Sequence, residues 1–180
     1  TDNSLDIYYV DLDGTGDEIF VSEPLASTSN DGPSQKAQVS ADGSRIVFQS
    51  RSSNIASGDT NFLDDVFIHD IAAQTNSLVS KNSSNNVGDK HSILPVVDSS
   101  GENVFFVSNA RNLSQEFNCT TSAFVSSWRQ LRVSPIDITE EKRCGNPVTD
   151  VFSPADSSYV SIGMVDEGFR NILISTSPLN

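Results

Sequence analysis

The strongest constraint on the fold of this chain is that one short stretch occurs twice. Val39–Ile55, VSADGSRIVFQSRSSNI, is followed 58 positions later by Val97–Leu113, VDSSGENVFFVSNARNL, and no gap is needed to align them. A fixed offset that keeps turn glycines, apolar positions and small polar residues in register indicates one supersecondary unit used repeatedly. The matched pairs are Val39 and Val97, Gly43 and Gly101, Ile46 and Val104, Phe48 and Phe106, Ser50 and Ser108, Asn54 and Asn112, and Ile55 and Leu113.

A second element repeats in the same order. Asp6–Leu12, DIYYVDL, matches Asp65–Ile71, DVFIHDI, at an offset of 59, and the IFVS that ends at Ser22 matches the SLVS that ends at Ser80. A diverged third copy occupies Ser122–Ser134 and Phe152–Gly163, and Arg170–Ser177 has the pattern of the opening strand of a fourth unit. We therefore divide the single domain, residues 1–180, into units at about 1–50, 51–108 and 109–163, with a partial unit at 164–180.

Each unit contains turns followed by short alternating apolar runs, which predict β-strands with side chains on two faces. Three or four such strands joined by turns form a small antiparallel meander, and a meander of this size cannot bury both of its faces alone. Stacking successive copies around an axis covers them. The sequence therefore predicts an all-β protein of β-propeller blades, each a four-stranded antiparallel meander, with about three recognisable blades. A β-helix is the alternative, but its repeats are usually about half this length or shorter.

Composition and charge narrow the class of partner. The apolar fraction of 36% and the many Ser, Asn and Asp residues suit short strands and turns better than long helices. The net charge of −13 argues against nucleic-acid binding, which needs clustered Lys and Arg. Cations, basic proteins or neutral glycans are the expected partners if the charge serves binding, but we favour the interpretation that it serves solubility. Since the chain contains no long uninterrupted apolar run, we expect no membrane span.

The repeated residues resemble a known family. VSADGSRIVFQS followed by DDVFIHDIAAQTNSLVS is similar to the Asp-40-type, WD-like repeats of TolB-like bacterial propellers. In that family the turn is Ser-x-Asp-Gly, the next strand ends Phe-x-Ser, and a later strand begins with Asp. The residues that match the turn and the strand after it are Ser40, Asp42, Gly43, Phe48 and Ser50, and those that match the later strand are Asp6, Ile7, Tyr8, Asp11 and Leu12, and again Asp65, Val66, Phe67, Asp70 and Ile71.

The resemblance covers the chain well up to Leu113 and weakly beyond it. It implies a propeller fold and a non-catalytic module that binds a protein or another ligand in the periplasm, in the secreted fraction or at the cell surface. Propellers of this family close with about six or more blades. The chain is therefore either a segment of a longer protein, which we favour, or one copy in a homo-oligomer that completes the ring. A propeller portion of a secreted hydrolase (a serine peptidase, a glycosidase or a lyase) and a calcium-dependent surface or adhesin module are the alternative functions.

The richest polar cluster is SGDTNFLDDVFIHD. Asp59, Asn61, Asp64 and Asp65 present oxygen ligands around a glycine, as a Ca²⁺ site requires, although the spacing is not that of an EF-hand loop. The same residues also suit a structural role. Asp59 and Asn61 can form Asx turns, and Asp65, like Asp6 in the earlier copy, can accept backbone hydrogen bonds from the neighbouring blade. We favour the structural interpretation and keep calcium as the competing hypothesis.

The remaining candidates also have structural interpretations. Asp42, Gly43 and Gly101 are expected to shape turns, and the acidic stretch from Asp11 to Glu18 is expected to be a solvated hairpin turn. His69 is predicted to be a half-buried strand residue, and His91, the other imidazole, precedes SILP without any nucleophile motif.

Two further groups fall in the diverged third unit. Trp128 with Arg129 and Arg132 is expected to cover a blade interface, and its alternative role is a binding anchor. Cys119 and Cys144 are expected to form a disulfide if the compartment is oxidising, and are otherwise free buried thiols.

Overall fold

The computed structural model describes residues 4–12, 16–26 and 29–113 with their side chains, and the backbone of the strands at 122–127, 132–135, 148–152, 159–166 and 168–175. Every regular element within these residues is a β-strand, and all neighbouring strands within a sheet are antiparallel. The predicted all-β class is therefore confirmed for this part of the chain.

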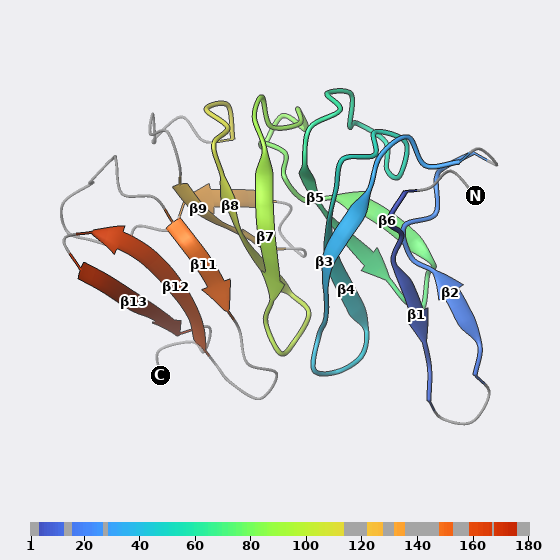
Figure 1. The fold of residues 1–180 in the computed structure, drawn as a ribbon, viewed down its shortest axis with the longest axis horizontal. Coiled ribbons are helices and arrows are strands. Elements are labelled where there is room, and N and C mark those ends of the chain that lie inside the picture. The colour runs from blue at the N-terminus through green and yellow to red at the C-terminus, as the bar shows by residue number, and fades with distance from the viewer. Residues whose placement is uncertain are drawn as a thin grey trace.

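The strands form four sheets, which follow one another along the chain and lie side by side (Figure 1). Within each sheet the spatial order is the order in sequence, so each sheet is a meander. The first sheet contains β1 (Tyr8–Val10) and β2 (Glu18–Phe20); the second contains β3 (Ser34–Val39), β4 (Arg45–Ser50), β5 (Asp65–Asp70) and β6 (Thr75–Leu78); the third contains β7 (Ser92–Val97), β8 (Asn103–Ser108), β9 (Ser122–Ser127) and β10 (Arg132–Pro135); the fourth contains β11 (Val148–Phe152), β12 (Tyr159–Asp166) and β13 (Gly168–Ser175).

The sheets are staggered by two strands relative to the units read from the sequence. The unit boundaries at about 50/51 and 108/109 fall between β4 and β5 and between β8 and β9, so each four-stranded sheet joins the end of one unit to the start of the next. Arg170–Ser177, interpreted as the opening strand of a fourth unit, contributes to β13, which pairs with β12 as the third strand of its sheet. That is the place of β5 and β9 in the two sheets before it.

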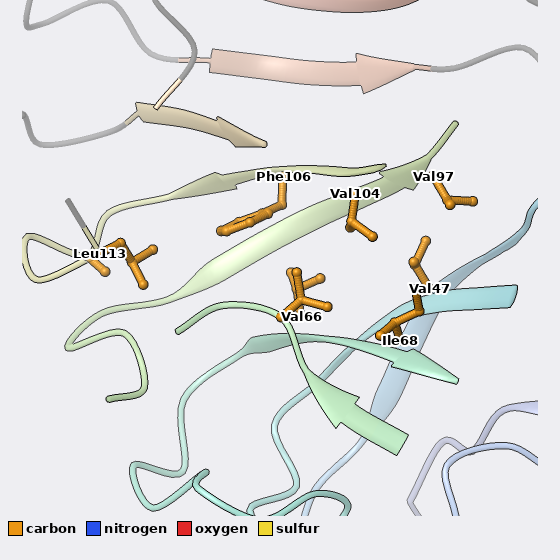
Figure 2. Packing of buried hydrophobic residues seen from close by; sticks show 9 residues of the cluster. Val47, Val66, Ile68, Val97, Val104, Phe106 and Leu113 are labelled. Carbon is orange, nitrogen blue, oxygen red and sulfur yellow. The ribbon is translucent and has the colours of Figure 1, made fainter. Parts of the chain in front are cut away.

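Apolar side chains fill the space between consecutive sheets. On β4, Ile46 and Phe48 face the first sheet, whereas Val47 faces the third, as the alternation of a strand requires. Figure 2 shows the core between the second and third sheets, in which Val47 and Ile68 face Val104 and its neighbours. That core contains Val47, Val66, Ile68, Val79, Val97, Val104, Phe106, Ala110 and Leu113, and the core between the first and second sheets contains Val21, Ile46, Phe48, Ile55, Ala56, Phe67 and Leu78.

The two copies of the repeated stretch have equivalent surroundings. Phe48 and Phe106 are both fully buried, each on the second strand of a four-stranded sheet, and each packs toward the preceding sheet. Burial of a phenylalanine side chain of this kind stabilises by about 1.5–3 kcal/mol. The fixed offset in the sequence therefore corresponds to a fixed position in the stack.

The first strand of each four-stranded sheet carries the same bulge. Lys36 and Ala37 lie opposite the single residue Phe48, and the register of β7 against β8 shifts in the same way between Ile93 and Val96. Lys36 has φ 58° and Leu94, at the same place in β7, has φ 54°. Such values are uncommon outside glycine, so their recurrence shows that this bend belongs to the unit.

Candidate functional site

The predicted calcium ligands lie in the loop before β5 and at its junction with that strand. The hydrogen bonds between loop residues two apart in sequence are those of two Asx turns. The Asn61 N–H donates to Asp59 Oδ1 at 3.3 Å, and the Leu63 N–H donates to Asn61 Oδ1 at 2.8 Å. The Asn61 side-chain amide donates to the backbone oxygen of Gly88 at 2.7 Å, which ties the loop to the segment before β7. The Asx turns predicted at Asp59 and Asn61 are therefore confirmed.

Asp64, the third of the four predicted calcium ligands, contacts Gln49 and His91. Its Oδ1 accepts from the Gln49 side-chain amide at 3.2 Å, and its Oδ2 lies 2.9 Å from Nδ1 of His91. The Asp64 N–H also lies 3.0 Å from the same Nδ1. If Nδ1 carries no proton it accepts from this N–H, and if it carries a proton it donates to the carboxylate, so the two contacts exclude one another.

Asp65 begins β5 and is completely buried. Its Oδ1 accepts from the Ser80 hydroxyl at 2.5 Å, and the same hydroxyl oxygen accepts from the Val66 N–H at 3.0 Å. We expected Asp65 to accept backbone hydrogen bonds from a neighbouring blade. Instead, the Ser80 hydroxyl, just after β6, links the Asp65 carboxylate to a backbone N–H. Burial raises the pKa of Asp65 to about 8; the Ser80 hydrogen bond opposes this rise, and the negative charge of Asp59 adds to it.

Asp6 forms the same arrangement in the earlier copy. The Ser22 hydroxyl donates to Asp6 Oδ1 at 3.3 Å and accepts from the Ile7 N–H at 3.1 Å. Asp6 also receives the Asn30 side-chain amide at 2.6 Å. The aspartate that leads each of these strands therefore accepts a hydrogen bond from a serine, and that serine belongs to the segment that repeats with it.

The sequence analysis did not assign a role to the serines, although the repeat contains the signal. Ser34 donates to Ser50 at 2.9 Å, and Ser92 and Ser108, each 58 positions later, lie the same 2.9 Å apart. All four residues are buried. These pairs join the first and second strands of each four-stranded sheet, so the repeated small polar residues hold the meander together.

The predicted turn residues lie in the hairpins that join the first and second strands. Gly43 has φ 69° and Gly101 has φ 72°, values that glycine adopts without strain. Asp42 accepts from the hydroxyls of Ser40 at 2.6 Å and Ser44 at 2.9 Å, and these hydrogen bonds, that of Ser40 first, hold the pKa of Asp42 below its usual value. Asp42 and the two glycines thus lie in these turns with bonds and dihedral angles that suit a turn.

His69 is a strand residue, as predicted, but it is completely rather than half buried, at 2% exposure. Its Nδ1 lies 3.0 Å from Asn76 Oδ1, and because the Asn76 amide donates to the backbone oxygen of Val21, the imidazole is the donor. The ring borders a cavity of about 380 Å³ between the first sheet and the β5–β6 hairpin. The cavity is lined by Glu18, Ile19, Phe20, Glu23, Pro24, Leu25, Ile55, His69, Gln74, Thr75 and Asn76.

Within the side chains that the structure describes, no group of three or more His, Cys, Asp or Glu residues is arranged to hold a metal ion. The four-residue calcium site stays a prediction, since its Asn61 oxygen is not of these types and Asp64 is directed to His91. Cys119 and Cys144 lie outside the described residues, as do Trp128 and Arg129, and only the backbone of Arg132 is described. The predicted disulfide and the predicted aromatic and basic anchor therefore stay predictions.

Comparison with known proteins adds no relative. The chain matches no protein-family model, and no curated protein is similar enough to it to be counted as one. Among the segments that the structure describes there is no helix with the length and hydropathy needed to cross a bilayer.

Proposed function

We propose that this chain is a non-catalytic binding module built of TolB-like β-propeller blades, which acts outside the bacterial cytoplasm. The proposal is supported by the agreement of two consecutive four-stranded meanders in register, bulge and buried serine pairs at the 58-residue spacing. The repeated polar residues are engaged in hydrogen bonds that shape strands and turns. Binding therefore falls to the surfaces that these repeats leave open.

The outer face of the first sheet is the surface that best supports a binding role. Tyr8 stacks on Phe20 with ring centroids 4.9 Å apart, and Tyr8 remains 53% exposed. At the equivalent places in the second sheet, Phe67 and Leu78 are buried against the first sheet. One face of the second sheet is covered by the first sheet. The equivalent face of the first sheet is apolar and exposed, and such a face suits another sheet of the same kind.

We assign a further blade as the partner of this face. In a complete propeller it belongs to the same polypeptide or to a second copy, and for the isolated chain the second copy is the available partner. The cavity beside His69 offers a second contact region. It combines the carboxylates of Glu18 and Glu23 with apolar side chains, which suits a basic group on a protein partner.

The test is the molecular mass of the isolated chain in solution, measured by analytical ultracentrifugation over a wide range of concentrations. We expect a concentration-dependent oligomer that is lost in Tyr8→Asp. Phe62→Ser is the matched control, because Phe62 is 60% exposed but lies in the loop before β5. A chain that stays monomeric throughout, or an oligomer that Tyr8→Asp leaves intact, contradicts association through this face. Labelling by a fluorophosphonate probe or turnover of a glycoside would support the hydrolase alternative instead.

A further inference from the structure

The two strand-leading aspartates differ in how completely their oxygens are satisfied. Asp6 receives hydrogen bonds from Ser22 and from the Asn30 amide. At the place of Asn30 the second copy has Gly88, 58 positions later, which has no side chain to donate. Asp65 keeps the bond from Ser80 on Oδ1, and because Asp65 is completely buried, its Oδ2 is buried without a hydrogen-bond partner.

A second carboxylate in the same loop also has a buried oxygen without a hydrogen-bond partner. Asp59 is 6% exposed; its Oδ1 accepts from the Asn61 N–H, and its Oδ2 is buried without a partner. The negative charge of Asp59 acts on Asp65, and the Asn61 amide also interacts with the Asp65 carboxyl. Two buried carboxylates of one loop thus each retain an oxygen that no donor satisfies.

Two negative charges in a buried site destabilise the fold strongly unless a positive charge accompanies them. The ion pairs found among the described residues join Arg45 to Asp70 and His91 to Asp64, so neither reaches this pair. The compensating charge must therefore come from outside the side-chain set, as a cation or as a proton. Because the surrounding donors are carboxylate, amide and hydroxyl oxygens in an irregular loop, a hard cation with flexible coordination suits them best.

We propose that Asp59 and Asp65 bind one calcium ion through the two carboxylate oxygens that lack partners. The two positive charges of the ion balance the two carboxylates, while a hydrogen bond from Asn61 holds Asp59 and one from Ser80 holds Asp65. This narrows the ligand set predicted from the sequence, since Asp64 is engaged with Gln49 and His91. We assign no such site to Asp6, because it is only half-buried and its Oδ1 accepts from both Ser22 and the Asn30 amide.

The test is thermal unfolding of the complete chain, freed of metal, with and without added Ca²⁺, and with Mg²⁺ as the competing cation. At a Ca²⁺ concentration about a hundred times Kd, the melting temperature should rise by about 5–10 °C. Asp59→Asn and Asp65→Asn should abolish the rise, whereas the matched control Asp64→Asn should retain it. Titration calorimetry at a temperature where every variant is folded should show one ion per wild-type chain and no heat of binding for Asp59→Asn.

Three outcomes overturn the proposal. One is the absence of both a thermal shift and a calorimetric signal with Ca²⁺. Another is a Ca²⁺ effect that survives in Asp59→Asn, which would place the ion elsewhere. The third is a stability that is indifferent to Ca²⁺ but falls as the pH rises toward 8 in the wild type and not in Asp65→Asn, which would show that the pair holds a proton. Since Asp59 lies in a loop and not in a strand, Asp59→Asn keeps the test decisive even if Asp65→Asn does not fold.

Discussion

Ser80→Ala should cost this fold more stability than the loss of one small surface group, because the Ser80 hydroxyl forms two buried hydrogen bonds. It accepts from the Val66 N–H at 3.0 Å and donates to Asp65 at 2.5 Å, and both Ser80 and Asp65 are completely buried. Alanine leaves a buried donor and a buried acceptor unsatisfied, each at about 1–3 kcal/mol. We therefore expect a loss of about 2–6 kcal/mol in the free energy of unfolding.

The repeat provides an internal comparison for this experiment. Ser22 forms the same two bonds, to Ile7 and Asp6, but Asp6 is only half-buried and keeps the Asn30 amide when Ser22 is removed. Ser22→Ala should therefore cost about 1–2 kcal/mol, less than Ser80→Ala. Urea unfolding in the presence of a chelator measures both, and Ser83→Ala, at an exposed position, is the control. A loss below about 0.5 kcal/mol for Ser80→Ala, or a larger loss for Ser22→Ala, would refute the assigned bonding.

The other predictions concern the core and the turns. Phe48→Ala and Phe106→Ala should each lose about 3–5 kcal/mol in urea unfolding, with Phe48→Ala about 1 kcal/mol worse because its ring also stacks on an aromatic partner on β5, 5.6 Å away. Losses that differ by several kcal/mol would show that the two positions are not equivalent. Gly43→Ala and Gly101→Ala should each lose about 1 kcal/mol, since both glycines have positive φ. Unchanged melting temperatures would contradict these turn conformations.

The sequence predicted the strands whose alternation is plain. RIVFQS, DVFIHD and NVFFVS became β4, β5 and β8, and the Asp-Gly turn before RIVFQS became the hairpin between β3 and β4. Each of these segments places apolar residues on two faces, and both faces are covered by neighbouring sheets. Local pattern and burial agree there, so the prediction required no knowledge of distant contacts.

The first strands were harder to predict, for a physical reason. SQKAQV and SILPVV contain a bulge, in which Lys36 and Leu94 adopt positive φ without being glycine. Nothing in the identity of a lysine or a leucine signals this conformation, because the surrounding sheet imposes it. The proline of SILPVV is the one local hint, since proline in a strand is found mainly at edges and bulges.

The candidate site shows the same division between local and distant contacts. The Asx turns at Asp59 and Asn61 follow from residues two apart, and the sequence predicted them. The contact of Asp64 with His91 joins residues 27 apart, in the loops that precede β5 and β7, and spacing alone gave no sign of it. The burial of His69 likewise depends on the first sheet packing over β5, which a strand pattern cannot report.

Comparison of the two copies locates the chemistry that is specific to this chain. Where the copies agree, as in the pairs Ser34–Ser50 and Ser92–Ser108, the residues join strands. The copies differ at many positions, and three of the changes lie close to the start of β5. Asn30 is replaced by Gly88, Pro33 by His91 and Leu5 by Asp64, and each replacement either contacts the Asp59–Asp65 loop or removes a donor from its aspartate.

In the second copy Asp59 and Asp65 each have a buried oxygen without a hydrogen-bond partner, which is a costly arrangement. The first copy avoids this cost because Asp6 is only half-buried and accepts from both Ser22 and Asn30. A bound cation removes that cost, and it explains why the cost is found in one copy only. Gly88→Asn tests this reasoning directly, because an amide that donates to Asp65 should weaken calcium binding and stabilise the metal-free chain. The added Cβ would lie 3.2 Å from the Ala110 side chain, which has to move by only a few tenths of an ångström to accommodate it.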